Sequence, residues 1–319
     1  MSGKTIPYHL RVNKIIERNL FIELLRIIDR YSPINDYTYI GMGGPFMEDF
    51  KYIHSSFNLK NMISIEMDEN VNRRQSFNLP YSCINHKNNM KIEEYIDTFI
   101  FEDPTIIWLD YTEPKELSRH LQELQVLTSK LNSGDILKIT LNANAKSLNQ
   151  NLEERMTKAK DRLTQYSPPD LCDEDLREEN YPQTLVNAIN IACKAGLAGR
   201  TGYVIQPLTA YSYADGQTMT TATAIVLSDA QKINFFDKTK ICDWREYSNE
   251  WSEVKSIKVP HLSAREKIFI ESRLPKLTAE EIISEMGYFI GENFSDAESE
   301  MESFTKYYLE YPQFSRVIS

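Results

Sequence analysis

Cysteine and histidine are scarce in this chain of 319 residues, and neither forms a metal-binding pattern. Cys83, Cys172, Cys193 and Cys242 lie far apart, and no CxxC or HxxxH pair occurs. The common zinc signatures are therefore absent, and no metal site is predicted. With no disulfide framework suggested either, we expect reduced thiols and a cytoplasmic location.

Long apolar runs and an excess of positive charge are also missing. No apolar run approaches the roughly 20 residues that span a bilayer, and the N-terminal segment lacks the apolar core of a signal peptide. The formal net charge of -10 disfavours attraction of the whole surface to nucleic acid or anionic lipid. We therefore expect a soluble protein with no membrane partner. Nucleic acid is disfavoured as a partner but stays open, because a local basic groove would suffice.

What the chain does contain is a regular alternation of strand-like and helix-like segments. An amphipathic helix at 10–30 ends at Ser32-Pro33. Strands are then predicted at 37–40, 62–66, 81–85, 105–110 and 135–143, and helices at 45–57, 69–78, 90–100 and 114–131. This order predicts a doubly wound α/β fold, in which helices cover both faces of a mostly parallel sheet.

The rest of the chain departs from this alternation. Two β-rich runs flank Gly216-Gln217 and predict an antiparallel hairpin, giving seven strands in all. Short helices are predicted at 263–274 and 278–289, the second with Thr278 and Glu281 as a capping box. We predict an N-terminal helical lid at 1–35, an α/β domain at 36–230 and a small C-terminal helical region at 231–319.

One turn in the alternating part is rich in glycine. The stretch "YIGMGGPFMEDF" places Gly41, Gly43 and Gly44 between a predicted strand and a predicted helix. Glycines let the backbone approach a ligand closely, and the N-terminus of a helix offers unpaired N–H groups. Tight strand-to-helix bends need glycine for steric reasons as well, so the turn alone leaves both readings open.

Three further features accompany this turn: Glu66 ends the second predicted strand, "IIWLDYTEP" contains the fourth, and a hairpin follows the fifth. With these features, residues 36–229 resemble the class I S-adenosylmethionine-dependent methyltransferases. The resemblance implies a seven-stranded sheet and S-adenosylmethionine as cofactor. It departs from the usual motifs where Tyr39 replaces an acid and Pro45 follows the adjacent glycines.

The resemblance also assigns expected site residues. Cofactor-binding residues would be Gly41, Gly43, Gly44, Glu66, Asp68 and Asn88, with Asn85, His86 and Asn89 near adenine. Asp110, Tyr111 and Glu113 would line the reaction centre, where Asp110 could orient or deprotonate the acceptor; Asn142 and Asn144 would lie near the cleft. His54 and His120 are expected to be surface or packing residues.

We therefore expect a methyltransferase or a methyltransferase-like protein. Oxygen or nitrogen of a small molecule or protein is favoured as acceptor over a DNA base, because "DYTEP" replaces the "DPPY" type of motif. One alternative is a non-catalytic scaffold whose C-terminal helices bind a protein partner or a second copy. Another is an enzyme that uses an adenosine-containing small molecule without methyl transfer. The segment carrying Lys4, Tyr8, His9, Arg11 and Lys14 could form a basic, aromatic lid over the site.

Overall fold

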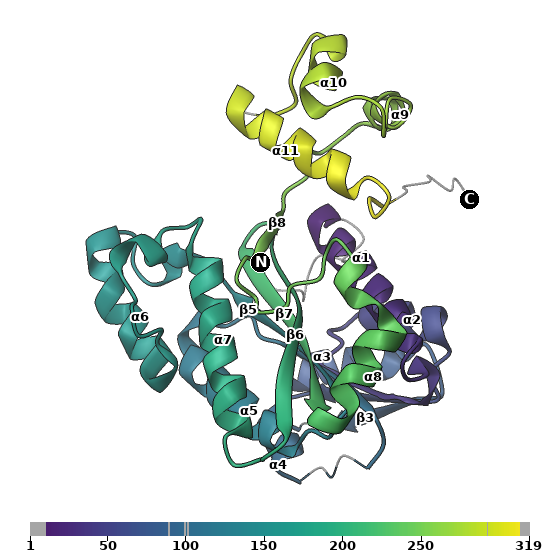
Figure 1. Cartoon of the computed structure of the whole chain (residues 1–319), viewed down its shortest axis with the longest axis vertical. Coiled ribbons are helices and arrows are strands. Elements are labelled where there is room, and N and C mark those ends of the chain that lie inside the picture. Colours follow the sequence, from purple (N-terminus) through teal and green to yellow (C-terminus); the bar gives the residue numbers. More distant parts are fainter. Residues whose placement is uncertain (1–10, 89, 99, 101, 292, 313–319) are drawn as a thin grey trace.

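The computed structural model describes residues 11–88, 90–98, 100, 102–291 and 293–312, and in them eight strands form one sheet (Figure 1). The strand order is β3-β2-β1-β4-β5-β7-β6-β8. Neighbouring strands run parallel except β7, which is antiparallel to both β5 and β6. The strands are β1 (Thr38–Gly41), β2 (Asn61–Glu66), β3 (Ile84–Asn88), β4 (Thr105–Asp110), β5 (Ile136–Asn142), β6 (Tyr203–Ala214), β7 (Thr218–Ser228) and β8 (Lys255–Ile257).

The predicted doubly wound sheet with its closing hairpin is confirmed, and a short eighth strand is added. Strand β8 pairs with β6 over only three residues, which is too short to produce a visible alternation in the sequence. The third strand begins at Ile84, three residues later than predicted, because residues 81–83 form a turn. The helix after the glycine turn begins at Glu48, because Met47 adopts a left-handed conformation.

Helices cover both faces of this sheet (Figure 1). On one face, apolar side chains of the sheet pack against α4, α5, α6 and α7, and on the other they pack against α1, α2 and α8. Helix α3 follows β2 and supports the glycine turn. The bounds are α1 (Val12–Asp29), α2 (Glu48–Phe57), α3 (Glu69–Asn78), α4 (Ile92–Thr98), α5 (Leu117–Lys130), α6 (Arg155–Leu163), α7 (Tyr181–Leu197) and α8 (Asp229–Thr239).

The C-terminal helices form a third apolar cluster, beyond the end of the sheet at which β8 and the N-terminus of α1 lie (Figure 1). They are α9 (Ala264–Glu271), α10 (Ala279–Met286) and α11 (Phe294–Tyr307). The capping box of Thr278 and Glu281 is confirmed at the start of α10. Val12, Ile16 and Leu20 of α1 belong to this cluster, so α1 packs both on the sheet and on the C-terminal helices. The predicted domain boundaries stay a prediction.

In the part of the chain that the structure describes, none of the helices combines the length and the apolar character that a membrane span requires.

Candidate functional site

The glycine turn follows β1 at the carboxyl edge of the parallel strands. Gly43 and Gly44 have φ values of +66° and +54°, a region that side chains with a Cβ rarely adopt. A Cβ on Gly43 would also lie 2.8 Å from the Phe50 ring. Gly43 is therefore required by backbone conformation and by packing, whatever the turn binds.

Helix α3 holds this turn in place from behind. The Gln75 amide donates to the carbonyl oxygens of Met42 (2.7 Å) and Gly44 (3.0 Å), and its own oxygen accepts from Ser64. The Asn78 amide donates to the carbonyl of Pro45 at 2.7 Å. Sequence reasoning missed both amides, because nothing local links positions 75 and 78 to a turn about 30 residues earlier.

Glu66, the last residue of β2, and Asp68 lie at the same edge of the sheet and make different hydrogen bonds. The Asp68 carboxylate accepts from the N–H groups of Asn70 and Val71, both at 3.0 Å, and so caps α3. The Asp68 N–H in turn donates to the Glu66 carboxylate at 2.8 Å. Glu66 is thereby oriented by the backbone, and both carboxylates line the cavity beside the glycine turn.

Asp110, the last residue of β4, and Tyr111, which follows it, line the same cavity. Tyr111 is buried, donates its hydroxyl hydrogen to Glu123, and stacks on His120 with ring centroids 3.9 Å apart. Burial, with Arg119 alongside, lowers the pKa of His120 to about 3, so this imidazole is neutral. Burial also raises the pKa of Tyr111 well above its ordinary value. This tyrosine is therefore a hydrogen-bonded wall residue and stays protonated.

We call this space the glycine cavity; its volume is about 360 Å³, within the range of small-molecule sites. It brings together the predicted residues Gly43, Gly44, Glu66, Asp68, Asp110, Tyr111 and Glu113. Among the described residues that line it, Lys91 and Arg119 are the two cations, against seven acids: Asp49, Glu66, Asp68, Glu93, Asp110, Glu113 and Glu123. Asp49 and Asp110 are paired with Arg18 and Lys14 from outside this lining. The remaining acids still outnumber Lys91 and Arg119, so the cavity suits a ligand with net positive charge.

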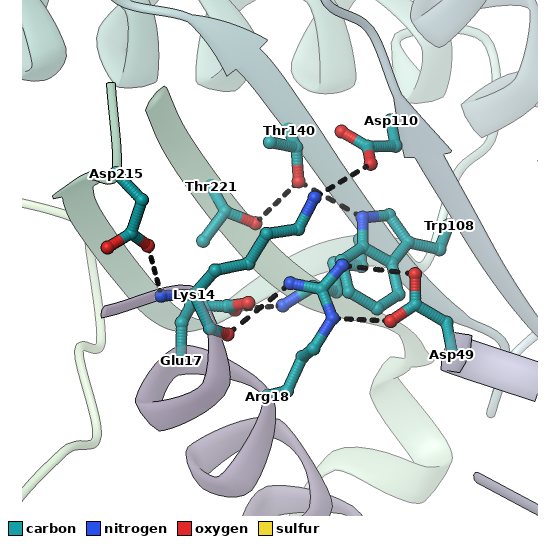
Figure 2. Close-up of polar contacts among 10 residues, drawn as sticks. Lys14, Glu17, Arg18, Asp49, Trp108, Asp110, Thr140, Asp215 and Thr221 are labelled. Atoms are coloured by element: carbon teal, nitrogen blue, oxygen red, sulfur yellow. Dashed lines mark hydrogen bonds and ion pairs between the residues drawn. The ribbon is translucent and has the colours of Figure 1, made fainter. Parts of the chain in front are cut away.

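Helix α1 is fixed over the sheet beside this cavity by buried charges (Figure 2). Glu17 pairs with Lys138 of β5, and both side chains are fully buried. Arg18 forms a two-pronged pair with Asp49, its second bond measuring 3.0 Å. Burial raises the pKa of Asp49, but the Arg18 guanidinium outweighs burial and the net shift is downward.

One turn before these pairs, Lys14 reaches the end of β4, with its Nζ 3.8 Å from Oδ2 of Asp110 (Figure 2). Lys14 was predicted only as part of a basic lid, and the same prediction's Lys4, Tyr8 and His9 lie outside the described residues. The pairing of Lys14 with Asp110 joins residues almost 100 positions apart, so no sequence spacing could have revealed it.

A second space, which we call the hairpin cavity, lies on the α1 side of Asp110 and has a volume of about 300 Å³. It shares Asp110, Thr112 and Glu113 with the glycine cavity, so the two spaces meet at the end of β4. Its other walls come from the start of α1, the end of β5 with Asn142 and Asn144, and the β6–β7 hairpin.

Some predicted residues lie elsewhere. Asn85 lines a separate hollow, together with Thr38 and Asn61 at the amino ends of their strands. His86 contacts the Ser76 hydroxyl at 3.0 Å and does not line the glycine cavity. Asn88 pairs with Glu66 in the sheet register, which places its backbone at the expected edge; Asn89 lies outside the described residues. A larger hollow of about 790 Å³ beside α1 and α8 contains none of the predicted site residues.

Strand order, hairpin and edge cavity together define the fold of the class I methyltransferases. The chain belongs to the family described as "Putative O-methyltransferase", whose sequence profile matches residues 6–319.

Solved structures resemble the chain more distantly. It is 13% identical to Trm1 from Pyrococcus horikoshii, solved with S-adenosyl-L-methionine, with a TM-score of 0.47 over 70% of this chain and 57% of that one. It is 11% identical to the N-methyltransferase NodS from Bradyrhizobium japonicum WM9, with a TM-score of 0.39 over 67% and 97% of the two chains. No curated protein matches the chain. Likenesses this distant carry no conclusion about its ligands.

Proposed function

We propose that this protein binds S-adenosylmethionine in the glycine cavity and transfers its methyl group to an oxygen of a small molecule. The observation that carries the proposal is the acidic lining of that cavity beside a glycine turn and a strand-end carboxylate. S-adenosylmethionine bears a sulfonium and an ammonium against one carboxylate, so its net charge is positive. A cofactor with a pyrophosphate, as in dehydrogenases, would be repelled by the same lining.

The residues present fit such a cofactor. Glu66, at the end of β2 and oriented by the Asp68 N–H, would accept hydrogen bonds from ribose hydroxyls. The acidic side chains near the turn and Asp110 would balance the ammonium and sulfonium charges. When bound, S-adenosylmethionine supplies an electrophilic methyl group on a positively charged sulfur.

Oxygen as the acceptor atom follows the family's description and the "DYTEP" sequence after Leu109, which differs from the motif of amino-group methyltransferases. The same proposal includes a small-molecule acceptor and a cytoplasmic location. It also includes the N-terminal lid and the C-terminal helical region as units separate from the α/β domain. A protein partner or a second copy on the C-terminal helices stays the main alternative, with the α/β part as a scaffold.

The test is calorimetric titration of S-adenosylmethionine and S-adenosylhomocysteine into the wild type and Glu66→Ala. Loss of charge-assisted hydrogen bonds should weaken binding by roughly 10- to 100-fold, since each such bond contributes about 1.5–3 kcal/mol. Lys60→Met, an exposed change at the amino end of β2, is the control and should bind as the wild type does. Absence of binding by the wild type would refute the cofactor assignment. Binding without methyl transfer to any acceptor would favour the alternatives.

A further inference from the structure

The hairpin cavity is assembled from segments far apart in the sequence. Its walls contain Lys14 from α1, Asp110 from β4, Asn142 from β5 and Gln217 from the β6–β7 hairpin. Asn142 ties two of these walls together, because its amide donates to the carbonyl of Thr112 at 3.1 Å and to the Gln217 side chain at 2.9 Å.

The start of α1 is fixed to the same hairpin. The N–H groups of Asn13 and Lys14 donate to the carboxylate of Asp215, at 3.3 Å and 2.8 Å. Asp215 therefore caps α1 from the hairpin, in a helix whose own N-cap residue makes no side-chain cap. The Asn13 amide also donates to the carbonyl of Ala214 at 3.0 Å. These bonds fix the backbone from which the Lys14 side chain extends.

The Lys14 side chain runs from this fixed backbone to the junction of the two cavities. It is buried and lines the hairpin cavity, and its Nζ lies 3.8 Å from Oδ2 of Asp110, a residue that lines both cavities. Burial lowers the pKa of Lys14 to about 8, with Arg18 and Arg11 lowering it further and Asp110 and Asp49 raising it. Its neutral form is therefore accessible near neutral pH, which a proton acceptor requires.

We propose that the hairpin cavity binds the methyl acceptor, a small polar molecule bearing a hydroxyl, and that Lys14 accepts the proton of that hydroxyl. The inference rests on the proposed function, because it assigns the second reactant of the same reaction. A volume of about 300 Å³ is at the lower end of ligand sites, which suits a small molecule. The side-chain amides of Asn144 and Gln217, which also line this cavity, offer N–H groups to further polar groups of the acceptor.

The proposed methyl transfer is an in-line displacement. The acceptor oxygen forms a bond to the methyl carbon while the carbon–sulfur bond breaks, and that electron pair passes to sulfur. The hydroxyl proton moves to the neutral Nζ of Lys14, and the resulting ammonium lies beside the Asp110 carboxylate. Asp110 holds the charge of Lys14 after transfer, and the proton then leaves to solvent.

To test this, the full chain is incubated with two additions. One is S-adenosylmethionine labelled with tritium in its methyl group, and the other is the small-molecule filtrate of a cell extract. The wild type should label compounds in that filtrate, with a rate that rises with pH through about 8. Lys14→Met should lower incorporation at least about 100-fold, and Lys14→Arg, which keeps the charge but cannot accept the proton, should be as inactive. Lys60→Met is the control and should retain the wild-type rate.

Two further measurements separate the role of Lys14 from folding and from cofactor binding. Both Lys14 variants should bind S-adenosylhomocysteine within about threefold of the wild type, since the cofactor contacts are elsewhere. The ¹³Cε resonance of Lys14, assigned by its absence in Lys14→Met, should titrate near pH 8, below the exposed lysines.

Three outcomes would overturn the inference while leaving the cofactor claim intact. The first is that the wild type binds S-adenosylhomocysteine but transfers tritium only to macromolecules, or to no acceptor at all. The second is Lys14→Arg with at least half of the wild-type rate, which would make Lys14 a charge and not a proton acceptor. The third is a ¹³Cε titration indistinguishable from that of exposed lysines. Failure of the wild type to bind S-adenosylhomocysteine would instead remove the proposed function itself.

Discussion

The two cavities that meet at Asp110 are built in different ways. The glycine cavity is formed by loops that each follow their own strand, so its walls at Gly43, Glu66 and Tyr111 lie at the ends of β1, β2 and β4. The hairpin cavity forms only where α1 contacts the β6–β7 hairpin, and these two elements lie about 200 residues apart in the sequence. The first is acidic, whereas the second mixes Lys14 and Arg11 with carboxylates and amides.

The two cavities therefore depend on different contacts. The glycine cavity depends on the backbone conformation of the turn after β1, which side-chain amides of α3 support. The hairpin cavity depends on the docking of α1, which two buried ion pairs and the Asp215 cap hold against the sheet. Changes at Gly43 should therefore damage the glycine cavity first, and changes at Asp215 the hairpin cavity, whereas the Arg18–Asp49 pair links the two.

The largest effect is expected from breaking the buried pair beneath α1. Glu17→Ala removes the partner of buried Lys138, and such a loss costs about 3–5 kcal/mol of unfolding free energy. The double change Glu17→Met with Lys138→Met should recover much of that loss, because no buried charge then remains alone. Urea denaturation measures both, with Glu23→Ala on the same helix as control. A loss below about 1 kcal/mol for Glu17→Ala would contradict the anchoring role of the pair.

An intermediate effect is expected at the glycine turn. Gly43→Ala would force a Cβ into a left-handed conformation and to within 2.8 Å of the Phe50 ring. Strain and overpacking together should lower the unfolding free energy by roughly 2–4 kcal/mol and weaken S-adenosylhomocysteine binding. Gly199→Ala is a matched control, because no atom lies within 4 Å of its added Cβ. Equal behaviour of the two variants would show that the turn is not conformationally constrained.

The smallest effect is a pH dependence that belongs to Lys14. Its folded pKa of about 8 lies below the ordinary lysine value, so between about pH 8 and 10.4 the unfolded chain binds more protons than the folded one. Relative to Lys14→Met, the wild type should therefore gain roughly 2–3 kcal/mol of unfolding free energy as pH rises through that window. Below pH 8 the difference should be constant. Denaturation at a series of pH values measures it, and a flat difference throughout would place Lys14 in solvent.

The same contrast explains what the sequence could predict. Strand order, the glycine turn, Glu66 and Asp110 were predictable because periodicity and strand-end acids are local signals. His120 is a buried packing residue, as expected, and stacks on Tyr111. Its place in the lining of the glycine cavity was not predicted, because its partner Tyr111 comes from another element. The meeting of Lys14 with Asp110 and of Asp215 with α1 depends on tertiary packing alone.

The most direct test of the account is a crystal structure of the full chain with S-adenosylhomocysteine. We predict that the ribose lies on Glu66, the homocysteine beside the glycine turn, and the sulfur at Asp110, where it faces the hairpin cavity and Lys14. S-adenosylhomocysteine bound outside the glycine cavity, or with its sulfur turned away from Asp110 and Lys14, would contradict the account.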